Sequence, residues 1–177
     1  MRIKIFVLLC LTAIMQFTGV TPLKASHYYY KQLSLKDGVT SAVRCILTDK
    51  QGFVWIGTKA GISRYDGHEL KKYVHSPNNP HSIPNNLIHQ IAEDEMSNIW
   101  ILTDKGIARY QRQSDDFFLP TDEKGNPIIA YSTCLTKDGV LFGSKDKVYF
   151  YSYRDSSLRL LQKLNKGNNF NISLLSL

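Results

Sequence analysis

The sequence predicts an all-β protein made of about three four-stranded antiparallel β-propeller blades that form an incomplete ring. The first observation behind this prediction is the stretch 52–67, which reads GFVWIGTKAGISRYDG. The second is its near copy 45 residues later, SNIWILTDKGIARYQR, and the third is a weaker copy, LTKDGVLFGSKDKVYFY. Each copy consists of short β-rich runs separated by turn residues, which is typical of repeated small sheets.

The first copy divides into four runs of strand length. VRCILTD and FVWIGT are rich in β-branched and aromatic residues, ISRY follows a turn that ends at Gly61, and HELKKYV alternates between two faces. Four short antiparallel strands in about 45 residues are the pattern of one propeller blade. A helical repeat of this length would need amphipathic stretches of about 10–15 residues. The sequence contains no such stretch.

One segment has mixed preferences. Residues 87–95 could form a helix by propensity alone. Their counterparts in the first copy, residues 42–50, include Val43, Cys45, Ile46 and Thr48, which favour a strand. The repeat therefore predicts a strand in both places.

The chain is divided into a leader and one repeat domain. Residues 1–25 begin with Arg2 and Lys4, continue with an apolar run and end near Ala25, which is the plan of a cleaved signal peptide. An uncleaved membrane anchor is the alternative. The domain then covers 26–177, with repeats at about 43–86, 87–130 and 131–170. We expect the mature protein to be exported to the periplasm.

Composition excludes some classes of partner. The formal net charge of +7 falls to about +4 when Arg2, Lys4 and Lys24 of the leader are excluded. No dense block of lysine and arginine remains, so we expect no binding of nucleic acid by this segment. Contact with a membrane would come only through parts missing from this chain.

Residues that recur between the copies are expected to build the scaffold. The tryptophans suit the space between neighbouring blades, the glycines permit tight turns, and the aspartates can accept hydrogen bonds from their own turn amides. Arg64 and Arg109 also recur, either as scaffold or as ligand contacts. The predicted structural residues are Asp49, Trp55, Gly61, Tyr65, Asp94, Trp100, Gly106 and Tyr110.

The sequence gives no basis for a catalytic, cofactor or metal site. It has no nucleophile elbow, zinc-protease motif, P-loop or Cys-x-x-Cys. The acid pairs 115–116 and 122–123 lie in a turn-rich stretch and are interpreted as solvated surface. His75 and His81 flank a Pro/Asn loop with no third ligand candidate nearby.

The two cysteines outside the leader have two interpretations. Cys45 and Cys134 could form a disulfide in an exported protein. They could instead be small buried apolar residues.

The run ILTDKQGFVWIGTKAGISRYDG resembles the two-component regulator propeller repeat. The second copy departs from that pattern at Ser97 and Leu102, where the pattern has glycines. The third copy lacks the tryptophan. The similarity covers residues 28 to about 153.

The resemblance implies a truncated N-terminal piece of the periplasmic sensor of a hybrid two-component system histidine kinase. Such relatives carry two seven-bladed propellers before a membrane span, a kinase and a DNA-binding domain. The implied function is sensing of oligosaccharides by a segment that is not itself an enzyme, with association into a homodimer left open. The alternatives are a fragment of a carbohydrate-active propeller enzyme and a non-functional remnant of a longer sensor gene.

Overall fold

The structure is a computed structural model that describes residues 42–163. The chain divides into two units, Met1–Gln32 and Leu33–Leu177, and all described residues belong to the second. The predicted signal peptide, residues 1–25, lies outside the described residues.

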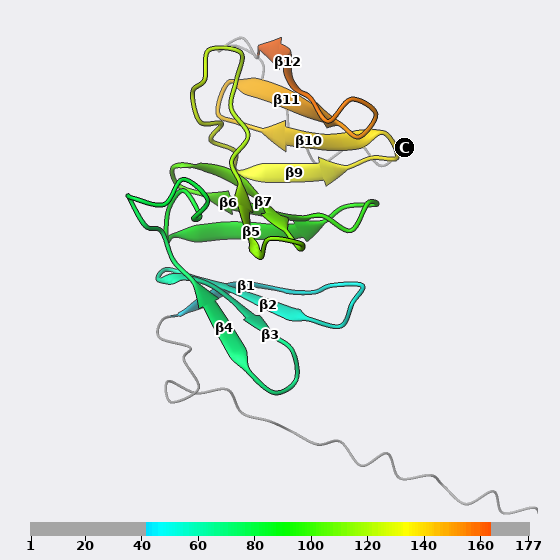
Figure 1. Cartoon of the computed structure of the whole chain (residues 1–177). Coiled ribbons are helices and arrows are strands. Elements are labelled where there is room, and N and C mark those ends of the chain that lie inside the picture. The colour runs from blue at the N-terminus through cyan, green and yellow to red at the C-terminus, as the bar shows by residue number, and fades with distance from the viewer. Residues whose placement is uncertain (1–41, 164–177) are drawn as a thin grey trace, which may run out of the picture. The chain divides into compact units, whose positions relative to one another are not determined.

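The described residues form three four-stranded antiparallel sheets, called blades 1 to 3 (Figure 1). The all-β prediction of about three four-stranded blades is therefore confirmed. Blade 1 contains β1 (Val43–Thr48), β2 (Val54–Thr58), β3 (Gly61–Tyr65) and β4 (Leu70–Tyr73). Blade 2 contains β5 (Ile88–Glu93), β6 (Ile99–Thr103), β7 (Gly106–Gln111) and β8 (Asp116–Phe118). Blade 3 contains β9 (Ser132–Leu135), β10 (Gly139–Gly143), β11 (Lys147–Ser152) and β12 (Leu158–Lys163).

Each blade is a meander in which neighbouring strands in the chain are neighbours in the sheet. Short turns make this order possible, because an antiparallel neighbour can begin within a few residues of the end of the preceding strand. The segment 87–95, whose propensity was mixed, contains strand β5. The strand prediction from the repeat is confirmed there.

The first turn of each of the first two blades needs a residue with positive φ. Gly52 supplies it in blade 1, at a φ of 88°. Ser97 occupies the equivalent place in blade 2 and adopts a φ of 60°. Ser97 thus keeps the turn geometry where the repeat pattern has a glycine. A positive φ costs free energy in a residue with a Cβ, and glycine avoids this cost.

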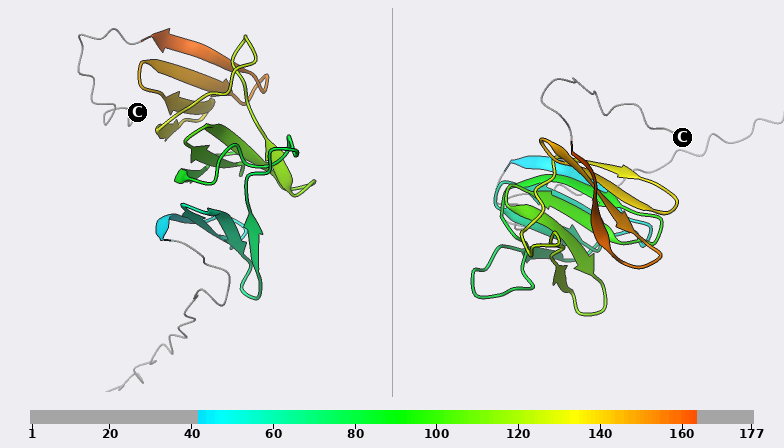
Figure 2. Two further views of the ribbon diagram at one scale, coloured as in Figure 1. Left: turned by 90° about the vertical axis from the view of Figure 1, so that its left-hand side faces the viewer. Right: turned by 90° about the horizontal axis from the view of Figure 1, so that it is seen from above.

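The blades are packed face to face, and the apolar core lies between them (Figures 1 and 2). One core cluster joins blades 1 and 2 and includes Trp55, Ile62, Ile99 and Tyr110. A second cluster joins blades 2 and 3 and includes Trp100. Each blade therefore buries its apolar side chains against its neighbour, as a stack of repeats does.

The two cores fill the space between the second strand of one blade and the first strand of the next blade in opposite ways. Gly57 on β2 has no room for a side chain, because an added Cβ would lie 2.8 Å from Cγ2 of Ile88 and 2.5 Å from Sγ of Cys45. In the second core cluster the position of Gly57 is taken by Leu102, and the position of Ile88 by Ala130. Leu102 is larger than the glycine of the repeat pattern, and the residue at the facing position in blade 3, Ala130, is smaller than Ile88.

Residues 42–163 contain no helix that is long and apolar enough to cross a membrane.

Candidate functional site

Blades 1 and 2 each hold a buried aspartate against the tryptophan of the same blade. Trp55 Nε1 donates to Asp49 Oδ2 at 3.0 Å, and Trp100 Nε1 donates to Asp94 Oδ2 at 2.8 Å. The other oxygen of Asp49 accepts the backbone N–H groups of Gln51 and Phe53. The carboxylate oxygens of both aspartates accept hydrogen bonds from the scaffold of their own blade, so neither carboxylate is available for general acid or base catalysis.

The charge of Asp49 is stabilised although the side chain is buried. Burial alone would raise the pKa of Asp49, but hydrogen bonds from Trp55, Arg112 and the backbone of Phe53, together with the Arg112 charge, outweigh it. The pKa of Asp49 therefore lies below its usual value.

The tryptophans lie between the blades. The Trp55 ring meets the Tyr110 ring of blade 2 edge-on, with centroids 4.8 Å apart. The Trp100 ring meets the Tyr151 ring of blade 3 in the same way, also at 4.8 Å. Such edge-to-face contacts stabilise beyond simple burial.

An arginine completes each of these contacts. Arg64 is the cross-strand partner of Trp55, and its guanidinium donates to the Tyr110 hydroxyl. Arg109 is the cross-strand partner of Trp100, and it donates to the Tyr151 hydroxyl at 2.5 Å. We call these groups joint 1 (Trp55, Arg64, Tyr110) and joint 2 (Trp100, Arg109, Tyr151). The two recurring arginines connect blades.

Joint 1 is extended by a carboxylate that the sequence analysis interpreted as solvated. Asp115 accepts hydrogen bonds from the side chains of Lys71, Tyr110 and Tyr73, the last at 2.6 Å, and lies 3.2 Å from Arg64 Nη1. That interpretation was wrong for Asp115. Three of its four partners belong to blade 1, so nothing in the surrounding stretch QSDDFF could indicate them.

The charged neighbours set the ionisation of Asp115. Burial would raise its pKa, whereas hydrogen bonds from Lys71, Tyr110 and Tyr73, with the Arg64 charge, lower the pKa to about 2. The same hydrogen bond to Asp115 adds to burial in raising the pKa of Tyr73. The network therefore holds Asp115 ionised and Tyr73 neutral at ordinary pH.

Joint 2 lacks this network. Lys71, which pairs with Arg64 across the strands, is replaced in blade 2 by Phe118, whose ring lies 5.1 Å from the Arg109 guanidinium. The place of Asp115 in the hairpin is taken in blade 3 by Ser156, which also has a positive φ, 52°. Joint 2 is thus held by aromatic contacts and by the hydrogen bond from Arg109 to Tyr151, whereas joint 1 also contains ion pairs with Asp115.

Blade 3 reverses the same cross-strand pair. Phe150 on β11 stands opposite Arg159 on β12, whereas Arg109 on β7 stands opposite Phe118 on β8. The Arg159 guanidinium lies 5.5 Å from the Phe150 ring, so the cation–π contact is retained with its members exchanged.

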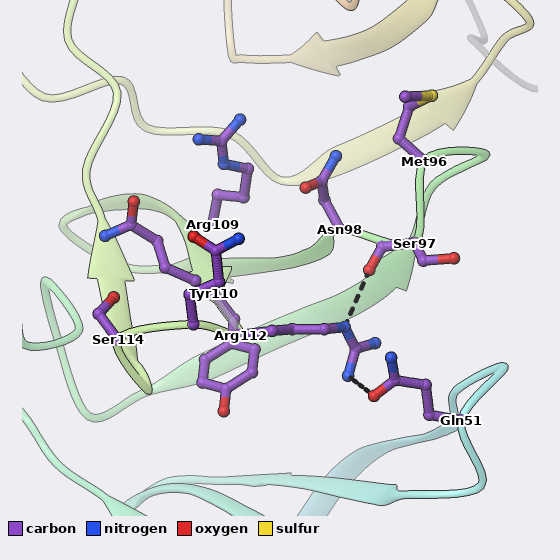
Figure 3. A pocket seen from close by; sticks show the side chains of 10 residues that line it. Gln51, Met96, Ser97, Asn98, Arg109, Tyr110, Arg112 and Ser114 are labelled. Carbon is purple, nitrogen blue, oxygen red and sulfur yellow. Dashed lines mark hydrogen bonds between the residues drawn. The ribbon is translucent and has the colours of Figure 1, made fainter.

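Arg112 makes a second connection between blades 1 and 2, in the turn after β7 (Figure 3). Its guanidinium donates to Asp49 Oδ2 at 3.0 Å, Gln51 Oε1 at 2.8 Å and the Ser97 carbonyl at 3.3 Å. Glu93, 7% exposed, lies 3.9 Å away. This contact borders an open pocket of about 480 Å³ whose polar walls include Gln51, Asn98, Arg109, Arg112, Gln113 and Ser114.

The remaining predicted residues shape turns. Gly61 has a φ of 112°, and an added Cβ would lie 2.5 Å from the Tyr73 carbonyl oxygen. Gly106 closes the equivalent turn of blade 2, where Thr103 Oγ1 donates to its carbonyl at 2.7 Å. Tyr65 donates to the Gly67 carbonyl at 2.5 Å.

Cys45 and Cys134 are not joined by a disulfide in the structure, so the disulfide alternative is not formed there. Burial raises the pKa of Cys45, against smaller opposing effects of Gly57 and Arg44. Among the described residues, no cluster of three or more histidine, cysteine or acidic side chains is arranged for a metal ion.

Four-stranded antiparallel sheets packed face to face through repeated tryptophan joints define the class of β-propeller proteins. Within that class, residues 37–60 match the model of the family described as Two component regulator propeller. The similarity to this family is therefore shown for residues 37–60.

One curated relative matches a longer stretch of the chain. Histidine kinase P4 of Formosa agariphila is 37% identical to this chain over 59 residues, which are 33% of this chain and 4% of that protein.

Solved structures support the fold. Two crystal structures of the extracellular domain of BT4673 from B. thetaiotaomicron, described as a one component system in one and a hybrid two component system in the other, have TM-scores of 0.53 and 0.55. Both are 24% identical to this chain and match 69% and 74% of it. The extracellular domain of BT3049 from the same organism, described as a hybrid two component system, has a TM-score of 0.54 at 18% identity over 80% of this chain.

The chain spans a small share of all these proteins. It covers 4% of the curated kinase, 16% of each BT4673 chain and 21% of the BT3049 chain.

Proposed function

We propose that this chain is a periplasmic ligand-sensing propeller segment of a hybrid two-component signal transduction system, and that its ligand is an oligosaccharide. The segment itself carries no catalysis. It binds ligand outside the inner membrane, and the kinase activity belongs to other parts of the sensor.

The match of residues 37–60 to the regulator propeller family is the observation that carries this proposal. The similarity to a histidine kinase and to extracellular domains of hybrid two component systems supports it. The occupied acceptors of Asp49 and Asp94 weigh against the carbohydrate-active enzyme, because these buried acids serve the scaffold.

The joints supply a mechanism for sensing. Each blade is tied to the next through a few directional contacts, such as Arg64 with Tyr110 and Arg109 with Tyr151. A ligand that binds one arrangement of the blades more tightly than another shifts the population towards that arrangement. The size of the shift is set by the difference in affinity, since equal binding to both arrangements changes nothing.

The test uses the native gene in its own bacterium. An in-frame deletion of codons 43–163 should abolish induction of the sensor's target genes by the inducing oligosaccharide, measured by transcript levels across a glycan panel. A silent recoding of the same codons is the control. Full induction in the deletion strain would contradict the sensing role.

The location is tested separately. The tagged full chain should appear in the periplasmic fraction, with a mature N-terminus close to Ser26 by mass spectrometry. Recovery of the uncleaved chain from the cytoplasm would contradict export.

A further inference from the structure

Three equivalent residues stand where the first strand of each blade begins. Arg44 lies between Val43 and Cys45, at an irregularity in the pairing of β1 with β2. His89 lies at the same irregularity in blade 2, between Ile88 and Gln90. An extra residue in a ladder is a β-bulge, which redirects a side chain and is enriched beside functional sites.

Blade 3 repeats the feature with Tyr131. Its backbone N–H donates to the Gly143 carbonyl at 2.8 Å, while Ser132 is the residue paired with Gly143. Two residues thus face one, as in a bulge. We call Arg44, His89 and Tyr131 the bulged row. The backbone bulge is present in all three blades, whereas the side chain at the bulge differs from blade to blade. A scaffold role would favour the same side chain in each blade.

The bulged row lies at a basic end of the blades. The turn between the second and third strands of each blade comes to this end, because the strands are antiparallel. These turns carry exposed Lys59, Lys105 and Lys145, together with Asp104 and Asp146. Among the described residues, neither Arg44 nor these lysines form an ion pair. The named side chains at this end therefore carry four positive and two negative formal charges, an excess of positive charge.

The centre of the row is preorganised. His89 Nε2 lies 2.5 Å from Asp104 Oδ1, which fixes the imidazole ring. The Tyr131 ring is 6.1 Å from the His89 ring, and the tyrosine is 57% exposed. An exposed aromatic ring beside a fixed polar pair can cover the C–H face of a sugar while the polar pair bonds its hydroxyls.

We propose that the bulged row binds a saccharide bearing a carboxylate or sulfate group. This proposal rests on the proposed sensing function. Arg44 pairs with the anionic group, since a guanidinium presents two parallel donors to such oxygens. Tyr131 stacks on the adjoining sugar ring, and the His89–Asp104 pair bonds a hydroxyl. The site lies at the opposite strand ends from the pocket beside Arg112.

Titration calorimetry on the full chain tests this site with three named probes. Oligogalacturonate supplies carboxylates, oligosaccharides of κ-carrageenan supply sulfates, and maltohexaose is neutral. We expect binding of one anionic probe that weakens with added salt. Arg44→Ala and Tyr131→Ala should each weaken it at least tenfold, and Lys124→Ala, an exposed lysine on a different loop, should leave it unchanged.

The results separate this site from the sensing function. An anionic probe whose affinity is the same in both variants would place the contacts elsewhere and overturn the site. Binding of maltohexaose alone, or of no probe, would overturn the anionic ligand class. In each of these cases the deletion experiment in the native gene still decides whether the segment senses. Melting curves of both variants that overlay the wild type establish that any loss is not unfolding.

Discussion

A single turn residue, Asp115, connects two blades through four donors that come from three strands. Its positive φ of 55° places the carboxylate toward blade 1 at some conformational cost. At the scale of residues, the molecule thus concentrates much of its polar stabilisation in a few acids. Asp49 and Asp115 both have a pKa below the usual value.

The depressed pKa of Asp115 predicts an acid-dependent stability. The carboxyl has a pKa of about 2 in the fold and about 3.9 in an unfolded chain. The folded chain therefore holds its stabilising charge fully above about pH 5, and loses it as the pH falls from about 4 through 2. The free energy of unfolding of Asp115→Asn should be lower at pH 7 and fall less steeply below pH 4, measured by urea titration at each pH.

The control for that experiment is Asp138→Asn, which changes an exposed acid outside the joints. If the free energy of unfolding of Asp115→Asn fell with pH as steeply as that of the wild type below pH 4, the network would not lower the pKa of Asp115 in the fold.

Removal of the Asp49 carboxylate should be costly because its partners are buried. Asp49→Ala leaves the Trp55 indole N–H and part of the Arg112 charge without an acceptor. We expect a loss of about 2–4 kcal/mol in the free energy of unfolding. Asp122→Ala, whose carboxylate bonds only groups of its own surface turn, should lose less than about 1 kcal/mol. Equal losses in urea unfolding would refute the distinction.

Repetition in the sequence marks the recurring aspartates, tryptophans and arginines, but it does not indicate their partners across blades. The aspartate and the tryptophan of each blade are six positions apart, so their hydrogen bond has a local signal. Arg112 and Asp49 are 63 positions apart, and nothing in either local pattern indicates the other. The exchange of Arg109 and Phe118 for Phe150 and Arg159 also becomes visible only when the strands are paired.

At the scale of elements, strands are predicted by alternation and turn residues, whereas bulges have no such signal. The segments 43–48 and 88–93 read as plain strands, and the irregularity at Arg44 and His89 emerges only from the pairing register. A bulge is a property of two strands together, so a pattern within one strand cannot specify it.

The space between β2 and β5 predicts a coupled pair of substitutions. Gly57→Ala should destabilise by about 1–3 kcal/mol because its Cβ meets Ile88 and Cys45. Ile88→Ala alone should lose about 2–5 kcal/mol through an empty volume. The double variant should lose at least about 1 kcal/mol less than the sum in urea unfolding, since each change accommodates the other.

Gly57→Ala combined with Ile128→Ala provides the matched comparison. Ile128 belongs to the core between blades 2 and 3, so those two losses should add. Additivity in both double variants would contradict direct packing of Gly57 against Ile88.

At the scale of the whole molecule, the described residues behave as a row of repeats in which each blade contacts its neighbours. Stability in such a row depends on each blade and on each interface. The interface of blades 1 and 2 carries the Asp115 network and the Arg112 contacts. The interface of blades 2 and 3 has aromatic contacts and hydrogen bonds such as Arg109 to Tyr151 and Gln90 to Thr133.

This organisation predicts a local response to Arg112→Ala. Loss of the guanidinium should reduce amide protection in β1 to β4 more than in β9 to β12, measured by hydrogen exchange with mass spectrometry. Arg154→Ala, an exposed arginine in a turn of blade 3, serves as the comparison. A uniform loss of protection across all three blades would indicate that the stack opens as one unit.

The exchanged pair in blade 3 has a consequence for how the three copies tolerate substitution. Phe150→Arg would restore at one position the residue found in the other two blades, and would set two guanidinium groups opposite each other because Arg159 already supplies one. A change towards the majority residue is therefore harmful here unless its cross-strand neighbour changes with it. Blades 2 and 3 each keep one arginine opposite one phenylalanine, so in these two blades the paired positions have to be altered together.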